Sequence, residues 1–165
     1  MILPNTLRTR LDEGKPTIGT HVMFSDPDIP ELIGDTGVFD YAEFSAEYSV
    51  LDSNNLYHLA RAGQCGNLPL IIKLDQEAQG FWAQMAMGAG FKGVLFTDIR
   101  TPSDVAECHD CIAPDTPDKC GRMGVKLRRP ALSSYDVVDY SVDLESFVFK
   151  IMIEIIIGLH IIKRN

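Results

Sequence analysis

Residues 68–74 (LPLIIKL) form a nearly continuous apolar run, and this run constrains the fold more than any other feature of the chain. A strand with one face in water alternates apolar and polar residues, whereas a strand covered on both faces does not. Strands covered on both faces occur mainly in parallel sheets that have helices packed on them. We therefore expect residues 68–74 to be a buried strand of an α/β domain.

Strand-like and helix-like segments alternate along the rest of the chain. Further strands are expected at residues 17–24, 39–48, 93–96 and 147–153, and helices at residues 54–62, 77–87 and 101–112. Another helix is expected to begin at Ser25-Asp26-Pro27-Asp28, which offers a capping side chain and a first-turn proline, and to end at Gly34 or Gly37. Thr101 and Asp104 have the spacing of a capping box. Residues 113–145 are expected to be a long loop.

This alternation predicts about five parallel βα units. Such units fit an open doubly wound sheet or part of a (β/α)8 barrel. The dinucleotide fingerprint G-x-G-x-x-G does not follow the first expected strand, and the P-loop pattern occurs nowhere in the chain. Both observations disfavour a nucleotide-binding open sheet.

Charge and composition exclude several classes of protein. The 165 residues include 15 Lys and Arg against 23 Asp and Glu, so the net charge is −8 and a general nucleic-acid binder is excluded. The first residues show no signal-peptide pattern, and the apolar segment at residues 147–162 is interrupted by Lys150, Glu154 and His160. We expect one domain over residues 1–165, a cytoplasmic location and no membrane partner.

Cys108, Cys111 and Cys120 give the spacing C-x2-C-x8-C, which allows a zinc or redox site. A structural zinc site normally has four ligands in two pairs, and no second pair follows here. Cys108 and Cys111 also lie three residues apart in an expected helix, so packing in the core is the favoured interpretation.

Polar residues follow the expected strands at the ends where barrels carry their chemistry. Glu47 and Tyr48 end the second strand, and Lys73 lies at the end of the third. Each is compatible with a solvated strand end as well as with a site. Glu154 interrupts an apolar segment, and a buried carboxylate is costly unless it is paired or metal-bound, so we expect Glu154 to be functional.

Several segments are similar to the motifs of one family. They are residues 7–20 (LRTRLDEGKPTIGT), residues 45–49 (SAEYS) beside the family's D-x-E-H, residues 71–74 (IIKL) beside L-V-R-V, residues 90–96 (GFKGVLF), residues 117–124 and residues 151–154 (IMIE). In this order and spacing the chain resembles the HpcH/HpaI aldolases. These are metal-dependent pyruvate aldolases that include 4-hydroxy-2-oxoheptanedioate and 2-keto-3-deoxy-sugar-acid aldolases.

The resemblance implies a (β/α)8 barrel that cleaves a 2-oxo-4-hydroxy acid reversibly to pyruvate and an aldehyde. Tyr48 stands where the family has its acid/base histidine, and Lys73 where an arginine holds the pyruvyl carboxylate. Glu47 matches the motif's glutamate and is expected to contact substrate. Glu154 matches the first carboxylate ligand of Mg2+ or Mn2+. Ser45 replaces the motif's aspartate, and Thr97 replaces the proline after the fourth strand.

A closed barrel needs about 200 residues or more, whereas this chain supplies about five of the eight units. The second metal carboxylate of the family also lies beyond Asn165. The domain is therefore expected to be an incomplete aldolase-type barrel, and a catalytically degenerate fragment that acts as a subunit or binding module is the alternative. A metal-free aldolase with a Schiff base on Lys73 is a further alternative. An uncovered sheet edge and the resemblance both predict a homo-oligomer, a trimer or hexamer.

Overall fold

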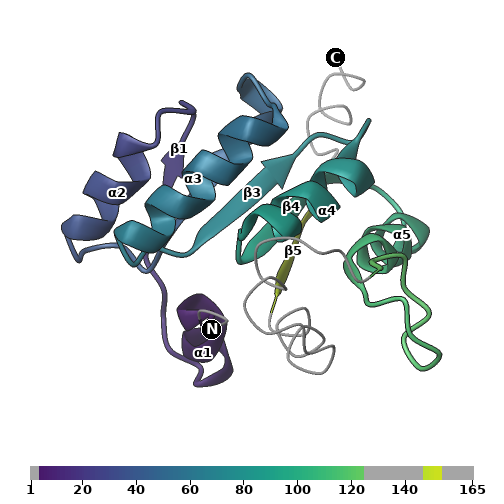
Figure 1. Cartoon of the computed structure of the whole chain (residues 1–165). Helices are drawn as coiled ribbons and strands as arrows, with labels where there is room; N and C mark the ends of the chain where they lie inside the picture. The colour runs from purple at the N-terminus through teal and green to yellow at the C-terminus, as the bar shows by residue number, and fades with distance from the viewer. Residues whose placement is uncertain (1–3, 125–146, 154–165) are drawn as a thin grey trace, which may run out of the picture.

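Five parallel strands form one sheet in the order β1-β2-β3-β4-β5, so each strand pairs with the next one along the chain (Figure 1). The structure is a computed structural model and describes residues 4–124 and 147–153. The strands are β1 (Gly19–Val22), β2 (Tyr41–Ser45), β3 (Leu70–Leu74), β4 (Gly93–Ile99) and β5 (Val148–Ile153). The helices are α1 (Thr6–Asp12), α2 (Asp28–Asp35), the 3-10 turn η1 (Ala46–Tyr48), α3 (Ser53–Cys65), α4 (Gln79–Ala89) and α5 (Pro102–Ile112).

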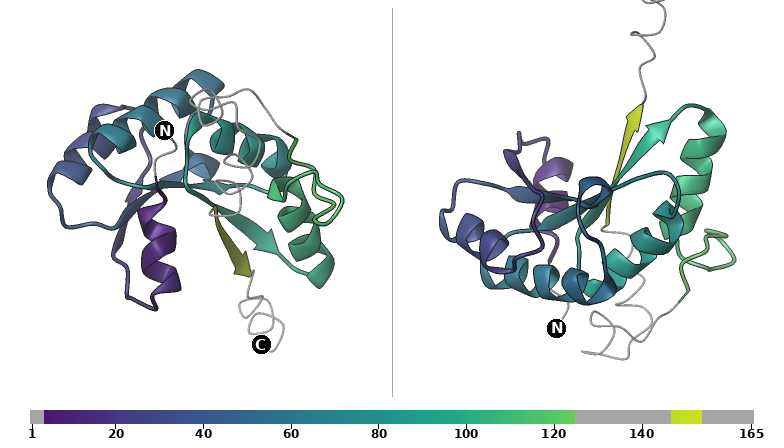
Figure 2. Two further views of the ribbon diagram at one scale, coloured as in Figure 1. Left: turned by 60° about the horizontal axis from the view of Figure 1, so that its bottom comes forward. Right: turned by 90° about the horizontal axis from the view of Figure 1, so that it is seen from above.

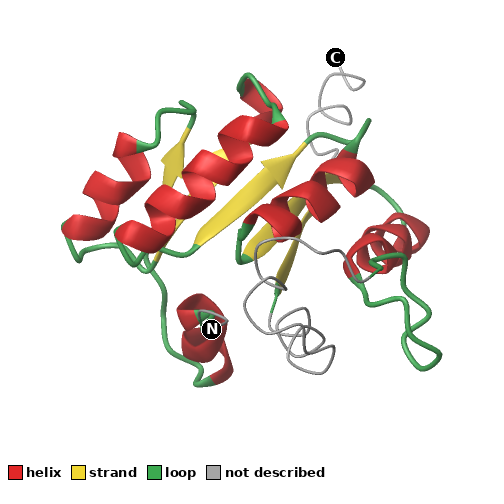
Figure 3. Cartoon of the chain, viewed as in Figure 1, coloured by secondary structure: helices red, strands yellow, loops and turns green. Residues whose placement is uncertain are grey.

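Strands and helices alternate as the sequence predicts (Figure 3). The sheet curves into an arc with α2, α3, α4 and α5 along its outer side (Figure 2). Within the described residues, β1 and β5 each pair on one side only, so the arc is not closed. The sequential strand order and the curvature confirm a partial (β/α)8 barrel and exclude the doubly wound alternative, in which the strand order reverses.

The two faces of the sheet bury different clusters. Leu70, Ile72 and Leu74 of β3 join the large core under the helices, while Ile71 between them faces the inside of the arc. All five residues of β3 are buried, which confirms a strand covered on both faces, although it begins at Leu70 within the expected range 68–74. Lys73 shares the inner face with Ile71 because side chains alternate along a strand.

Helix α1 is not indicated by the sequence pattern, because only one of its seven residues, Leu7, is buried. The Asn5 side chain caps the helix by accepting from the Arg8 amide, and its Nδ2 donates to the Lys92 carbonyl at 2.8 Å. Leu7 packs with Ile71 and Val148 on the inner face of the sheet. A single anchor and a cap thus position α1, without the apolar periodicity that would reveal a helix.

Helix α2 begins at Asp28, within the expected segment, and the Asp26 side chain accepts from the Asp28 amide at 3.0 Å. Pro27 directly precedes the helix instead of lying in its first turn. The expected end of β2 is wrong. Strand β2 ends at Ser45, and residues 46–48 turn into η1 instead of extending the strand to Tyr48.

The capping box at the start of α5 is confirmed. Thr101 Oγ1 accepts from the Asp104 amide at 3.2 Å, and Asp104 Oδ2 accepts from the Thr101 amide at 2.9 Å. Across the described ranges 4–124 and 147–153, the helices are too short or too polar to span a bilayer.

Replacing Leu7 with alanine should lower the free energy of unfolding by about 2–5 kcal/mol, because the substitution opens a cavity between α1 and the inner face of the sheet. Leu11→Ala on the same helix is the matched control, since Leu11 is 44% exposed and Leu7 only 2%. Urea denaturation of both variants measures the difference. An equal decrease in the free energy of unfolding of the two variants would contradict the packing of Leu7 against the inner face of the sheet.

Candidate functional site

Glu47, Tyr48 and Lys73 lie together at the carboxyl end of β2 and β3. The parallel register places Ser45 opposite Lys73, so η1, which follows Ser45 directly, carries Glu47 and Tyr48 past the end of β3. Lys73 Nζ lies 2.7 Å from Glu47 Oε2 and 4.8 Å from the centre of the Tyr48 ring. Lys73 is only 8% exposed, whereas Tyr48 is 65% exposed. The structure therefore brings three of the four predicted site residues into one cluster.

The Lys73–Glu47 pair keeps both groups ionised. Burial opposes the charge of Glu47, but hydrogen bonds from Lys73 and Tyr48 and the Lys73 charge outweigh it and hold the Glu47 pKa below its usual value. Burial likewise opposes the charge of Lys73, while the hydrogen bond and charge of Glu47 raise the Lys73 pKa above its usual value.

A raised pKa makes Lys73 a poor nucleophile at neutral pH, because a Schiff base requires the neutral amine. The metal-free aldolase is therefore the least favoured of the predicted reactions. An ammonium group has further N–H donors beyond the one that meets Glu47, so Lys73 is suited to hold an anion. The site can thus bind a carboxylate through a fixed positive charge.

A second polar cluster lies beside the first on the inner face of the sheet. His21 of β1 stands opposite Glu43 of β2, and its Nδ1 lies 3.3 Å from Glu43 Oε1 and 3.2 Å from Ser45 Oγ. Glu43 is 6% exposed. Sequence reasoning missed Glu43, although a carboxylate that alternates with Tyr41 and Ser45 on a buried strand is a usable signal. Because Ser45 is opposite Lys73, this cluster adjoins the Lys73 cluster.

Thr97 occupies the position of the family's proline at the end of β4. It is 1% exposed, and its hydroxyl donates to the Leu74 carbonyl at 2.8 Å. The next residue, Asp98, has a φ of 58° at an irregularity of the β4–β5 pairing. Thr97 therefore stabilises the rim of the sheet, because its donor is already used by the backbone.

The predicted metal ligand Glu154 lies outside the described residues, and the cysteines do not add a metal centre. Cys108 and Cys111 are buried in the core, and burial together with the neighbouring Cys111 raises the pKa of Cys108 to about 11. Burial raises the pKa of Cys111 as well. Protonated thiols are poor ligands and nucleophiles. Residues 4–124 and 147–153 contain no group of three His, Cys, Asp or Glu side chains suited to a metal ion.

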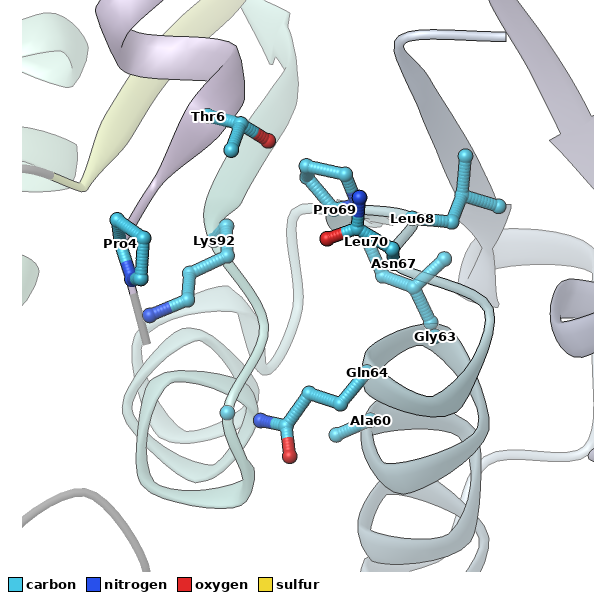
Figure 4. Close-up of a pocket in the computed structure, with 11 residues that line it drawn as sticks. Pro4, Thr6, Ala60, Gly63, Gln64, Asn67, Leu68, Pro69, Leu70 and Lys92 are labelled. Atoms are coloured by element: carbon cyan, nitrogen blue, oxygen red, sulfur yellow. The ribbon is translucent and has the colours of Figure 1, made fainter. Parts of the chain in front are cut away.

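A pocket lies at the opposite end of the strands, between α1, α3 and the segments that precede β3 and β4 (Figure 4). Gln64, Asn67 and Lys92 contribute polar groups to it, and its volume is about 80 Å³. This is below the roughly 300–1,000 Å³ of typical ligand pockets. In barrels this amino-terminal end serves stability, so the candidate site is the opposite rim, with Lys73 and His21.

Comparison with solved structures gives strong structural matches at low sequence identity. The HpcH/HpaI aldolase/citrate lyase family protein from Burkholderia cenocepacia J2315 matches with a TM-score of 0.79 and 22% identity, over 95% of this chain and 62% of that chain. The HpcH/HpaI aldolase from Desulfitobacterium hafniense DCB-2 matches with a TM-score of 0.73 and 17% identity, over 94% of this chain and 60% of that chain. The citrate synthase SbnG matches with a TM-score of 0.72 and 17% identity, over 95% of this chain and 59% of that chain.

The chain has the fold of the HpcH/HpaI aldolases. It spans 62% and 60% of the two solved aldolase-family chains, so the match covers only part of their barrels. No protein-family model matches the chain, and no curated protein gives a significant sequence match. The similarity predicted from the motifs is thus confirmed at the level of the fold.

Replacing Glu47 with glutamine should lower the free energy of unfolding by about 1–3 kcal/mol at pH 7, because the buried Lys73 ammonium exchanges a carboxylate partner for a neutral amide oxygen. The Glu47 pKa is lowered from 4.5 in the folded state, so this contribution is present above pH 4.5 and is lost as the pH falls through the folded value. The Lys73 pKa is raised from 10.5, so its contribution is present below pH 10.5 and is lost at higher pH.

Urea denaturation of the wild type and Glu47→Gln between pH 3 and pH 8 measures this dependence. The control is Glu13→Gln, which removes the exposed Glu13–Lys15 pair and should cost no more than about 1 kcal/mol. A Glu47→Gln effect that matches the control, or that does not shrink in acid, would contradict the paired state of Lys73.

Proposed function

We propose that this chain binds a 2-oxo acid at the carboxyl ends of β2 and β3 and acts as a pyruvate-type aldolase, a carbon–carbon lyase. The proposed reaction is the reversible cleavage of a 2-oxo-4-hydroxy acid to pyruvate and an aldehyde. The observation that carries the proposal is the buried Lys73 ammonium, held between Glu47 and Tyr48 at the rim of an aldolase-like sheet.

Lys73 would neutralise the substrate carboxylate. The surroundings of Lys73 keep it charged. Because Lys73 is buried, an anion that binds it gives up contacts with water and gains a contact with an ammonium group held in place. Glu47 keeps Lys73 in place, and the exposed Tyr48 ring lies beside the ammonium group, where it can contact the rest of the substrate. Lysine binds a carboxylate as a point charge and lacks the fork of the arginine that the family uses, so weaker substrate affinity is expected.

In the cleavage, a base removes the proton of the 4-hydroxyl group and the C3–C4 bond breaks. The bonding electron pair goes to C3 and forms the enolate of pyruvate, while C4 becomes the aldehyde carbonyl. A proton then adds to C3 to give the pyruvate methyl group. Removal of a methyl proton from pyruvate regenerates the same enolate, so exchange of these protons with D2O reports the second half of the reaction.

The proposal includes dependence on Mg2+ or Mn2+, which rests on the resemblance at Glu154 alone. Such a metal would act as a Lewis acid toward the 2-oxo group. The described residues do not form a metal site by themselves, so we assign no step to the metal. Glu154→Gln should weaken Mn2+ binding if Glu154 is a ligand.

The second candidate is a catalytically degenerate barrel that serves as a subunit or binding module. It is favoured by the same contact that carries the first proposal, since Glu47 already compensates the charge of Lys73 and the Tyr48 ring lies over it. A binding module would hold a 2-oxo acid without exchanging its methyl protons, and this difference separates the two candidates.

With pyruvate and Mn2+ in D2O, the wild-type protein should exchange the pyruvate methyl protons above background, as measured by proton NMR. Lys73→Met should lose this exchange and weaken pyruvate binding, because the carboxylate loses its cation. Lys15→Met is the control, since Lys15 pairs with Glu13 on an exposed surface. Pyruvate binding without exchange in the wild type would support the binding module, and the absence of both would exclude both candidates.

We also propose that the chain forms a homo-oligomer, a trimer or hexamer, because β1 and β5 each lack one neighbour within the described residues and open strand edges favour pairing. Sedimentation equilibrium should therefore give a mass of three or six times 18.3 kDa. A stable 18.3 kDa species at micromolar concentration would contradict this proposal.

A further inference from the structure

The buried carboxylate of Glu43 is the feature of the inner face that the proposed function leaves unexplained. Glu43 is 6% exposed, and its Oε1 is shielded from solvent and makes no hydrogen bond within the described residues. A buried carboxylate oxygen in this state is costly unless another group completes its hydrogen bonding. His21 Nδ1 lies 3.3 Å from this oxygen, which is within hydrogen-bond distance but not at the angle of a hydrogen bond.

The register of β1 and β2 sets this contact. His21 and Glu43 are opposite each other in the parallel pair, and Ser45, two residues after Glu43, stands on the same face. His21 Nδ1 lies 3.2 Å from Ser45 Oγ, to which it is hydrogen-bonded, and 3.3 Å from Glu43 Oε1, while the imidazole itself is 69% exposed. One ring nitrogen faces buried oxygens, and the other belongs to a ring that solvent and small molecules can reach.

A carboxylate beside Nδ1 favours the tautomer that carries its hydrogen on Nδ1, because only an N–H can donate to the carboxylate. The lone pair is then on Nε2. A serine hydroxyl can accept as well as donate, so Ser45 is compatible with the same tautomer. The environment of His21 thus produces an imidazole that can accept a proton at Nε2, with Glu43 stabilising the imidazolium that forms.

We propose that His21 is the acid/base residue of this site and that Glu43 is its positioning residue; this inference rests on the proposed function. Ser45 links the dyad to the carboxylate-binding cluster, because it contacts His21 and is the register partner of Lys73. Tyr48, which stands where the family has its acid/base histidine, instead packs its ring against the Lys73 ammonium.

Every proton in this step is accounted for. His21 Nε2 takes the proton of the substrate 4-hydroxyl as the C3–C4 bond breaks, and the imidazolium then returns a proton to C3 of the enolate to give pyruvate. In the exchange reaction with pyruvate alone, His21 takes a methyl proton, equilibrates with D2O and returns a deuteron.

The first test is the tautomer of His21, measured from the ¹⁵N shifts of its ring by long-range proton–nitrogen NMR. The wild type should show hydrogen on Nδ1. Glu43→Gln keeps the side-chain volume but can donate an amide N–H to Nδ1, so the hydrogen should move to Nε2. A wild-type His21 with its hydrogen on Nε2, or a tautomer that Glu43→Gln does not change, would overturn the role of Glu43.

The second test is pyruvate methyl exchange in D2O with Mn2+. His21→Gln should lower the exchange rate by about 100-fold or more, as is typical when a general acid/base is lost. Pyruvate binding should stay at the wild-type level, because Lys73 is intact. The matched control is His58→Gln, since His58 is an exposed histidine on α3 and should not affect exchange. Glu43→Gln should also lower the exchange rate. Glu43→Asp, which keeps the carboxylate, should lower it less.

The outcomes separate the failure of this inference from the failure of the proposed function. If the wild type exchanges the methyl protons and His21→Gln does so at the same rate, the role of His21 is overturned and the aldolase proposal stands. The same holds if Tyr48→Phe loses the exchange while His21→Gln retains it. Absence of exchange in the wild type overturns both. Loss in His21→Gln with pyruvate binding retained, together with hydrogen on Nδ1 in the wild type, supports the dyad.

Discussion

The parallel pairing of β2 with β3 is the constraint on which the rest of the structure depends. It joins one edge of β3 to β2, while the helices cover one face of β3 and the interior of the arc covers the other, and it places Ser45 opposite Lys73. Because all strands run in one direction, their carboxyl ends meet on a single rim. A lysine at the end of an otherwise apolar strand is thus held inside the arc, and η1 brings Glu47 and Tyr48 to it without any long-range loop.

Two pairs of polar side chains on this rim differ in their distances and burial. Lys73 and Glu47 compensate each other at 2.7 Å, and each keeps the other ionised, so the pair holds an ammonium group and a carboxylate side by side. His21 and Glu43 lie 3.3 Å apart, and the imidazole is largely exposed while the carboxylate is buried. Neither pair depends on the cysteines, which are held in the core as protonated thiols or lie exposed on the surface.

Much of the fold could be predicted from local sequence, and the reasons are physical. The run at residues 70–74 lacks alternation because water reaches neither face, and the Thr101–Asp104 box reports a helix start through two side-chain bonds within four residues. Helix α1 could not be predicted in this way, because its position depends on Leu7 meeting Ile71 and Val148, which are distant in sequence. The expected end of β2 lies three residues beyond the observed one. The mixture of apolar and polar residues in η1 is also typical of the end of a strand, so the sequence does not distinguish the two.

The candidate site, like the fold, could be predicted from the sequence only in part. The motifs by themselves determined that Glu47, Tyr48 and Lys73 belong together and that the chain has an aldolase-like α/β architecture, because side-chain type and spacing survive in the sequence. Only the tertiary structure decided that Lys73 is already paired, that the Tyr48 ring packs against it and that His21 meets Glu43. Those contacts join residues that lie on or directly after different strands, and the register between strands is set by the packing of the whole sheet rather than by any one segment.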